Sequence, residues 1–357
     1  MRRLGVTALS AVVLAGAAVL LVPASASGER LLFVTRHGTQ LVLQGKPYRF
    51  TGLNIYNANS TNDNCWYSMG SGPILGQSLR QIGAGKEVFR AWFFQSLATR
   101  NGQRDWAAFD HTLAVAALHG YRVIVTLGNQ WGDCEPGSGY RNDSWYRSGY
   151  RLQDSSGIVS YRDWVKEVVT RYRFIPTILA WQLVNEAEVK TSREAASCPE
   201  DAAAVLKAWA ADVSGLIKSI DRYHLVSLGT LGSGQCGASW QEYKDVHSVP
   251  TIDLCEYHDY GAPLDPMPGD PFNGLAFRIQ QCNELNKPLF VGETGIIPTD
   301  VGGTLEARAA AFDNKFRVQF AAGVVGELAW AWSALGSRLD NYDIGRQDPT
   351  LQVLGRY

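Results

Sequence analysis

The stretch WQLVNE, from Trp181 to Glu186, decides the reading of the fold. It continues the apolar segment Ile175–Ala180, so that a hydrophobic run ends abruptly in an amide and a carboxylate. A buried parallel strand has such a continuous apolar run, and barrel enzymes carry their reactive groups at the carboxyl ends of the strands. A solvated loop between a strand and a helix would explain a single Asn-Glu pair equally well, so the decision depends on the other strands.

Seven further short apolar runs alternate with longer segments of helical periodicity. The eight predicted strands lie at residues 48–56, 87–92, 121–127, 175–186, 224–229, 252–258, 288–293 and 325–332. Helix-like segments lie at residues 106–119, 161–172, 202–220, 272–285 and 305–320. This alternation predicts parallel pairing with right-handed crossovers.

The fold class that explains this count best is α/β, a closed (β/α)8 TIM barrel. A doubly wound sheet would require a glycine-rich phosphate turn after the first strand, whereas Asn54–Asn59 contains no glycine. Leu31–Leu43 is expected to form an N-terminal β-hairpin that covers one end of the barrel. Long inserts are expected after the first and third strands, at Asn59–Gly72 and Gly128–Gly157.

The amino terminus predicts export. Two arginines, an apolar run from Val6 to Val22 and the sequence Ala24-Ser25-Ala26 are typical of a secretory signal peptide, here residues 1–26. An uncleaved membrane anchor is the alternative, but the run is marginal for spanning a bilayer. Residues 27–357 then form a single secreted domain, expected to be monomeric and free of the membrane. A net charge of -1 among 357 residues argues against nucleic-acid binding.

Six cysteines, all after the signal segment, favour disulfides in an exported chain. The absence of a C-x-x-C motif argues against a zinc site. The positions of the cysteines on the predicted strand map favour the pairs Cys65–Cys134, Cys198–Cys236 and Cys255–Cys282.

Polar and aromatic side chains end most of the predicted strands. They are Arg90 on the second strand, Asn185 and Glu186 on the fourth, His258 and Tyr260 on the sixth, Glu293 on the seventh, and Trp330 and Trp332 on the eighth. Alternation along a strand points such residues toward the barrel axis. Strands four and seven face each other, so Glu186 and Glu293 could approach the ~5 Å separation of a retaining glycosidase. Two carboxylates beside an arginine and aromatic rings suit glycoside hydrolysis, whose transition state resembles an oxocarbenium ion.

The same residues resemble glycoside hydrolase family 5 of clan A. Val184–Glu186 and Val291–Gly295 match the acid/base and nucleophile motifs, and Arg90, the His258–Tyr260 segment and Trp330 match other family positions. Phe50–Asn54, Thr126–Asn129 and the Asn-Glu pair resemble the endo-β-1,4-mannanases in particular.

The resemblance implies roles for the site residues. Glu186 would be the general acid/base and Glu293 the nucleophile, without metal or cofactor. Asn185 would bind the sugar 2-hydroxyl, while Tyr260 and Arg90 would orient Glu293 and keep it ionised. The remaining expected substrate-binding residues are His258 beside the acid, Trp330 under the sugar, and Trp332, Asn54 and Trp131.

Several carboxylates leave alternatives open. A buried Arg90 requires a carboxylate partner, which could be Glu256, unless Glu256 points outward to the helices. Glu256 and Asp259 do not fit the mannanase pattern. Glu327 begins its strand and is expected to be structural, and Glu188 is expected at the rim.

The substrate also stays open at this point. The expected substrate is a mannan-type polysaccharide; β-glucan, xylan or exo-acting β-glycosidase activity is the alternative, and a non-catalytic carbohydrate-binding protein is a further one.

Overall fold

The computed structural model describes residues 32–357 except 62–64, 66–67, 84, 86 and 154–156, so the predicted signal peptide lies outside the described residues. Eight parallel strands form a nearly closed barrel, which confirms the predicted fold class. The strands are β4 (Phe50–Asn54), β5 (Val88–Trp92), β8 (Arg122–Thr126), β9 (Ile178–Gln182), β10 (Leu225–Ser227), β11 (Cys255–Asp259), β12 (Leu289–Thr294) and β13 (Gly326–Ala329).

The strand order β10-β9-β8-β5-β4-β13-β12-β11 follows the chain around the ring. A bridge between Ser227 and Leu254 connects its two ends, β10 and β11. Each predicted strand is present close to its expected place. β9 is buried along its whole length, as the continuous apolar run required. Glu186 follows four residues after β9, and Glu293 is the fifth residue of β12.

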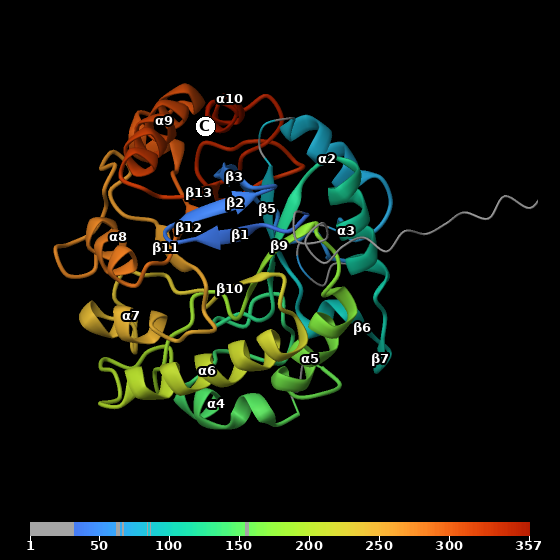
Figure 1. Cartoon of the computed structure of the whole chain (residues 1–357). Coiled ribbons are helices and arrows are strands. Elements are labelled where there is room, and N and C mark those ends of the chain that lie inside the picture. The colour runs from blue at the N-terminus through green and yellow to red at the C-terminus, as the bar shows by residue number, and fades with distance from the viewer. Residues whose placement is uncertain (1–31, 62–64, 66–67, 84, 86, 154–156) are drawn as a thin grey trace, which may run out of the picture.

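Helices surround the barrel on its outside (Figure 1). They are α2 (Ile74–Ile82), α3 (Ala107–Leu118), α4 (Asp143–Arg147), α5 (Tyr161–Tyr172), α6 (Ala202–Ile220), α7 (Trp240–His247), α8 (Leu275–Glu284), α9 (Leu305–Ala321) and α10 (Thr350–Leu354). Short 3-10 turns lie at η1 (Gln95–Ala98), η2 (Gly149–Arg151) and η3 (Pro298–Val301), and β6 (Thr99–Arg100) pairs with β7 (Gln103–Arg104). The five predicted helices are present as α3, α5, α6, α8 and α9, whereas α2, α4, α7 and α10 escaped prediction.

The amino-terminal end of the barrel is covered by an antiparallel sheet of three strands, β1 (Thr35–His37), β2 (Gln40–Leu43) and β3 (Lys46–Tyr48) (Figure 1). Val34 and Leu41 share a buried cluster with Phe50 and Phe290 of the barrel, so apolar contact holds the cover in place. The predicted hairpin is therefore present. Its first strand begins at Thr35, later than the apolar residues suggested, and β3 takes up the start of the first predicted barrel strand.

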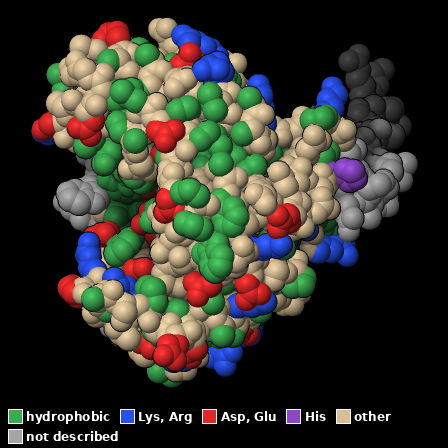
Figure 2. Space-filling model, turned by 90° about the vertical axis from the view of Figure 1, so that its left-hand side faces the viewer, with side chains coloured by type: hydrophobic (Ala, Val, Ile, Leu, Met, Phe, Trp, Pro, Cys, Tyr) green, Lys and Arg blue, Asp and Glu red, His purple; other side chains and the backbone are tan. Residues whose placement is uncertain are grey.

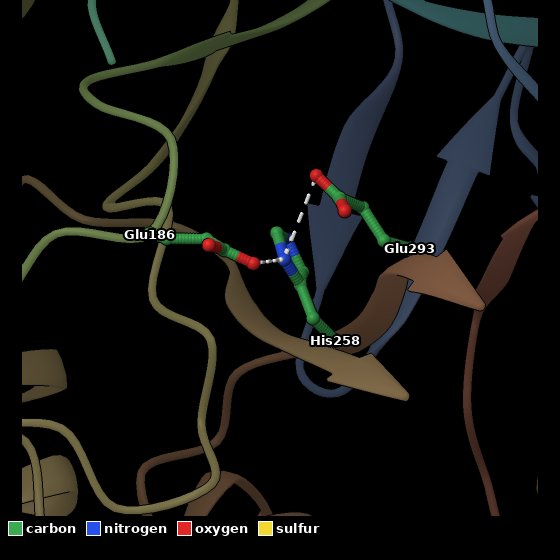
Figure 3. A group of neighbouring side chains, drawn as sticks. All are labelled: Glu186, His258 and Glu293. Atoms are coloured by element: carbon green, nitrogen blue, oxygen red, sulfur yellow. Dashed lines mark hydrogen bonds and ion pairs between the residues drawn. The ribbon is translucent and has the colours of Figure 1, made fainter. Parts of the chain in front are cut away.

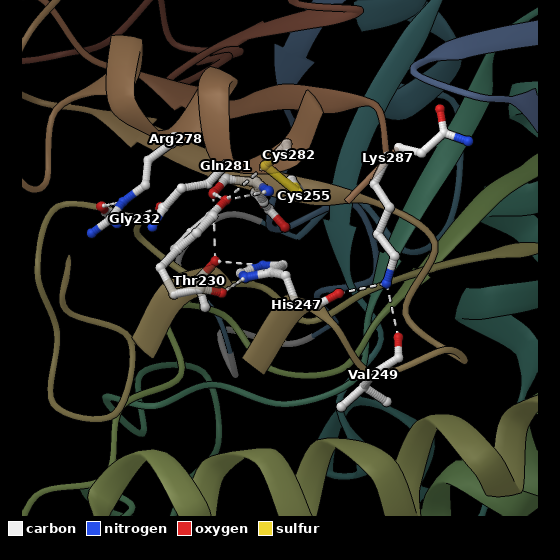
Figure 4. Close-up of a disulfide and its surroundings, with 12 residues drawn as sticks. Thr230, Gly232, His247, Val249, Cys255, Arg278, Gln281, Cys282 and Lys287 are labelled. Carbon is white, nitrogen blue, oxygen red and sulfur yellow. Dashed lines mark hydrogen bonds between the residues drawn. A yellow bond between two sulfur atoms is a disulfide. The ribbon is translucent and has the colours of Figure 1, made fainter. Parts of the chain in front are cut away.

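Three disulfides match the expected pairs. Cys65–Cys134 joins the segments that follow β4 and β8, and Cys198–Cys236 joins those that follow β9 and β10. Cys255–Cys282 ties β11 to α8 beside buried Arg278, His247 and Lys287 (Figure 4). Within the described residues, no helix combines the length and apolarity needed to cross a membrane.

Candidate active site

A cavity of about 560 Å³ opens at the carboxyl ends of the strands. The surface is hollowed at the left of Figure 2, on the side away from the β1–β3 cover. Its walls combine carboxylates, amides and aromatic rings. The lining residues are Tyr56, Trp92, Asn129, Trp131, Asp133, Cys134, Asn185, Glu186, Tyr260, Glu293, Trp330, Ala331, Asn341, Tyr342 and Asp343.

Glu186 and Glu293 meet in this cavity with His258 between them (Figure 3). Nδ1 of His258 lies 2.9 Å from Oε1 of Glu186 and 3.6 Å from Oε1 of Glu293. One ligand atom from each of the three residues lies within 4.8 Å of the others, which places the two carboxylates face to face. This spacing is close to the ~5–5.5 Å typical of two carboxyl groups in a retaining glycosidase.

Arg90 on β5 anchors Glu293 from below. Its Nη1 lies 2.6 Å from Oε1 of Glu293, and the arginine side chain is fully buried. Three other guanidinium hydrogens go to side-chain oxygens of Asn54 (2.9 Å), Gln182 (2.8 Å) and Asn185 (2.5 Å). The carboxylate partner expected for a buried arginine is therefore Glu293, and the alternative partner, Glu256, is wrong.

The second oxygen of Glu293 accepts a hydrogen bond from the hydroxyl of Tyr260, at 2.6 Å. Tyr260 lies just past the end of β11, and its ring packs against Tyr342 from the C-terminal segment, with ring centroids 5.4 Å apart. Glu293 is thus held through both oxygens, which fixes its orientation toward the cavity.

Glu186, which follows β9, faces two hydrogen-bonding side chains. Oε2 accepts from Nε1 of Trp131 at 2.5 Å, and Oε1 faces His258. Its backbone has a φ of 57°, in the left-handed region. Such a conformation costs a non-glycine residue on the order of 1–3 kcal/mol and is concentrated at functional sites. The strained backbone therefore lies at the residue whose carboxylate lines the cavity.

The charges of the site shift three pKa values. Burial alone would raise the pKa of Glu186, but the hydrogen bond and charge of His258 outweigh it, so that pKa lies below its ordinary value. Burial raises the pKa of Glu293, against the opposing charges of His258 and Arg90. Burial would lower the pKa of His258, but Glu293, Glu186 and Glu256 raise it to about 10. The proton between His258 and Glu186 therefore resides on the imidazole.

Asn185 connects the two halves of the site. Its Oδ1 accepts from Arg90, and its Nδ2 donates to Oδ1 of Asn129 at 3.0 Å. Trp330 lines the cavity and stacks on Tyr56, with ring centroids 5.2 Å apart and 12° between the planes. The stacked pair presents a rigid aromatic wall, the kind of surface that suits the apolar face of a sugar ring.

Four residues expected to bind substrate do not line the cavity. Trp332 is 3% exposed and belongs to the hydrophobic core, because the chain turns inward to pair with Ile344. Asn54 is fully buried beneath Arg90. Arg90 and His258 also lie behind the cavity wall and act on it through the two glutamates.

The four open carboxylates are also placed. Glu256 points into the barrel, 3.2 Å from Nε2 of His258, and not to the helices. Asp259 points outward and pairs with Lys315 of α9 at 2.8 Å. Glu327 on β13 is fully buried, and its carboxylate accepts a hydrogen bond from the hydroxyl of Thr294. Glu188 is buried and accepts from Tyr140, so the rim position is wrong.

Several lining residues escaped prediction. Tyr56 and Trp92 directly follow or end strands and could have been found from that position. Asn341, Tyr342 and Asp343 come from the segment after the last strand, which has no periodic pattern.

Glu186, His258 and Glu293 each offer an atom that could bind a cation. Both oxygens of Glu186 and both of Glu293 already face hydrogen-bond donors of the protein. A cation would displace these donors and stand beside the buried charge of Arg90, so we assign no ion to this group.

Comparison with known proteins finds similarity to glycosidases. A family profile described as GH family 5 beta-mannosidase-like matches residues 140–262. The chain is 29% identical over 292 residues to a probable mannan endo-1,4-beta-mannosidase C of Aspergillus terreus, covering 67% of this chain and 68% of the relative. It is 26% identical to mannan endo-1,4-beta-mannosidase 8 of Oryza sativa subsp. japonica, covering 86% and 92%.

Solved structures agree with the fold. The endo-1,4-beta-mannanase of Rhizomucor miehei superposes with a TM-score of 0.68 at 21% identity, covering 90% of this chain and 97% of that one. The family 5 mannosidase of the same organism gives a TM-score of 0.64 at 18% identity, covering 92% and 97%. Together with the sequence relatives, these matches confirm the family resemblance drawn from the strand-end motifs.

Proposed function

The chain is related to the β-mannosidase-like proteins of glycoside hydrolase family 5, and from that relationship we propose that it hydrolyses β-1,4 linkages of a mannan-type polysaccharide with retention of configuration. The single observation that carries the proposal is the meeting of Glu186 and Glu293 at the mouth of the barrel, with oxygens within 4.8 Å of each other. Two carboxyl groups at this separation leave no room for the water of an inverting reaction.

In the first step, an oxygen of Glu293 attacks the anomeric carbon and the glycosidic C–O bond breaks. Glu186 gives its proton to the leaving oxygen, so that a glycosyl ester on Glu293 and a free alcohol result. In the second step, Glu186 takes a proton from water, the hydroxide oxygen bonds to the anomeric carbon, and the ester bond to Glu293 breaks. Two inversions restore the original configuration.

The surrounding residues support these roles. Arg90 and Tyr260 hold the two oxygens of Glu293 and stabilise its charge when the ester bond breaks. Trp131 holds Glu186 on the side of the leaving group. The Trp330–Tyr56 wall offers an aromatic face to the sugar at the reacting position.

The test is the variant Glu293→Ala, assayed on a soluble mannan. We expect a loss of turnover of at least roughly a thousandfold, because the covalent intermediate cannot form. Added azide should restore part of the rate and yield a glycosyl azide of inverted configuration. Unchanged turnover in the folded variant would remove Glu293 as the nucleophile.

Product analysis decides the finer questions. Oligosaccharides of mixed length from a β-1,4-mannan indicate internal cleavage, as the names of the sequence relatives suggest. Release of single mannose units indicates action at chain ends. A preference for β-glucan or xylan over mannan would change the proposed substrate and leave the proposed two-step retaining mechanism unaffected.

The proposal includes secretion and a monomeric state. Its supports are the predicted signal peptide at residues 1–26, which lies outside the described residues, and three disulfides, which persist in oxidising compartments. Amino-terminal sequencing of protein recovered from the culture medium would test cleavage after Ala26.

A further inference from the structure

Directly beneath the two glutamates lies a third buried carboxylate, Glu256 on β11. Its Oε1 accepts from Nε2 of Gln182 at 2.5 Å, and its Oε2 accepts from the hydroxyl of Ser227 at 2.6 Å. Oε1 also lies 3.2 Å from Nε2 of His258. The side chain is completely buried, so its negative charge acts at short range in a medium that screens it weakly.

We propose that Glu256 is a positioning residue of the hydrolase: through His258 it fixes one proton in the hydrogen bond to Glu186. This inference rests on the proposed function, because it assigns the source of the proton that the general acid delivers. The mannanase pattern did not account for Glu256, and the geometry around His258 does.

The hydrogen-bond chain limits where protons can lie around His258. A carboxylate only accepts, so Nε2 of His258 must carry hydrogen where it meets Glu256. At the other ring nitrogen, Nδ1 and Oε1 of Glu186 lie 2.9 Å apart. A hydrogen bond there requires one proton, either on Nδ1 or on Glu186. The pair thus holds the transferable proton whichever atom carries it.

This arrangement reconciles the low pKa of Glu186 with its role as an acid. Before the acid acts, the proton is on Nδ1 of His258, whose pKa is raised to about 10. When the acid acts, the Nδ1–H bond breaks and an Oε1–H bond forms, leaving a neutral imidazole and a neutral carboxyl. Glu186 then gives that proton to the leaving oxygen, and the proton taken from water in the second step restores the pair.

The charged groups around the imidazole ring come from four elements. They are Glu186 after β9, Glu256 on β11, Glu293 on β12 and, behind Glu293, Arg90 on β5. Of the three carboxylates, Glu256 alone stays outside the bond-making steps. Its charge is therefore constant through the cycle and biases the proton toward the His258–Glu186 pair at every stage.

The backbone of β12 makes room for this contact. A Cβ atom at Gly292 would lie 2.2 Å from Oε1 of Glu256 and 3.1 Å from Nε2 of His258. Any larger residue beside the proposed nucleophile would push Glu256 away from the ring. The absence of a side chain at Gly292 thus leaves the space that the carboxylate of Glu256, on the neighbouring strand, occupies.

The test is Glu256→Gln, which keeps the shape of the side chain and removes its charge. The amide oxygen can still accept from Gln182, and the amide NH2 can meet Ser227. We expect the pKa of His258 to fall by about 1–3 units, the usual effect of losing one nearby opposite charge. The alkaline limb of the kcat/KM profile on mannan should move to lower pH by a similar amount, while the acid limb, which reports Glu293, stays in place.

Two readouts separate this inference from the function itself. NMR of the labelled histidine rings follows His258 directly, with its signal assigned by its absence in His258→Asn, and needs no activity. Glu327→Gln is the matched control, since it replaces another fully buried glutamate whose side chain contacts Thr294. The control should leave the His258 titration and the alkaline limb unchanged.

Three outcomes would overturn the inference. One is a wild-type His258 that titrates near ~6.5, the ordinary value. Another is a folded Glu256→Gln variant with the titration and the alkaline limb of the wild type. The third is a Glu327→Gln control that shifts both readouts as far as Glu256→Gln. Because the wild-type titration alone can refute it, the inference stays testable even if the variant does not fold.

Discussion

Replacing Arg90 with methionine should move the acid limb of the pH–rate profile upward. Nη1 of Arg90 lies 2.6 Å from Oε1 of Glu293, which puts the centres of the two charges about 4 Å apart. At an effective dielectric constant of ~20, the pair is worth ~4 kcal/mol, or roughly 3 pKa units. His258 remains 3.6 Å away in the variant and keeps part of the stabilisation, so we expect a rise of roughly 2 units for Glu293.

The assay is kcat/KM on a soluble mannan from pH 3 to pH 10. Glu293 must be ionised to attack, so a raised pKa removes activity at low pH and spares it at high pH. The matched control is Arg308→Met, which removes another fully buried arginine that is paired with a carboxylate, Asp348, and touches neither glutamate. Both variants should lose thermal stability, since each takes the arginine partner away from a buried carboxylate.

The result that refutes the reasoning is an acid limb at the wild-type pH in a folded Arg90→Met variant. Such a result would mean that Tyr260 and His258 alone hold Glu293 in its charged form. A shift of the same size in Arg308→Met would show that the limb reports general loosening and not the Arg90 charge.

Three further predictions concern neighbouring features. Trp131→Phe removes the N–H donor to Glu186 and should raise the alkaline limb of kcat/KM by up to ~1 unit; an unchanged limb would contradict the contact. Cys65→Ser with Cys134→Ser opens a disulfide that spans 69 positions and should lower the free energy of unfolding in denaturant by about 2–4 kcal/mol, with a higher KM because Cys134 lines the cavity. Burial lowers the pKa of His247 to about 3. Below pH ~6.5 the unfolded chain therefore binds a proton at this histidine that the folded chain does not bind. The free energy of unfolding falls as the pH drops from there toward 3. His247→Asn should therefore lose about 2–3 kcal/mol less than the wild type between pH 7 and pH 4.5, as measured by urea unfolding at both pH values.

The fold could be predicted because parallel barrel strands are buried on both faces. Strands buried on both faces have continuous apolar sequences, which can be recognised. Their alternation with segments of helical periodicity is compatible with only a few topologies of the chain. α2, α4, α7 and α10 escaped because each is short, with nine, five, eight and five residues. α2 contains Gly76 and two polar residues in its centre, and α7 contains three charged residues.

The candidate site could be predicted where it lies at strand ends and not elsewhere. Glu293 is placed by alternation along β12, and Glu186 and Tyr260 are placed by following the ends of β9 and β11, all of which the sequence displays. Asn341–Asp343 reach the cavity from a segment that folds back without regular structure. Trp332 was misplaced because two residues of the same phase need not share an environment once the strand has ended, and β13 ends at Ala329.

The identity of ion-pair partners is a different kind of information, since it depends on distances across the barrel. Glu256 and Glu293 both stand on strands whose inward face meets Arg90, and strand alternation alone gives no reason to prefer either. In the structure, Arg90 donates a hydrogen bond directly to Glu293. Its contact with Glu256 is indirect, because Gln182 accepts from Arg90 and donates to Glu256. Gln182, on the strand that leads to Glu186, thus keeps the lower carboxylate and the arginine apart.

That separation determines how protons are distributed in the site. Three carboxylates, Glu186, Glu256 and Glu293, face two cations, Arg90 and protonated His258. If Arg90 paired with Glu256, Glu293 would depend on His258 for its charge, and the proton could not leave the ring without costing the nucleophile its ionisation. With Arg90 committed to Glu293, the proton on His258 can move to Glu186 while the nucleophile stays charged. A retaining mechanism requires both states at once, and the interposed amide of Gln182 makes them compatible.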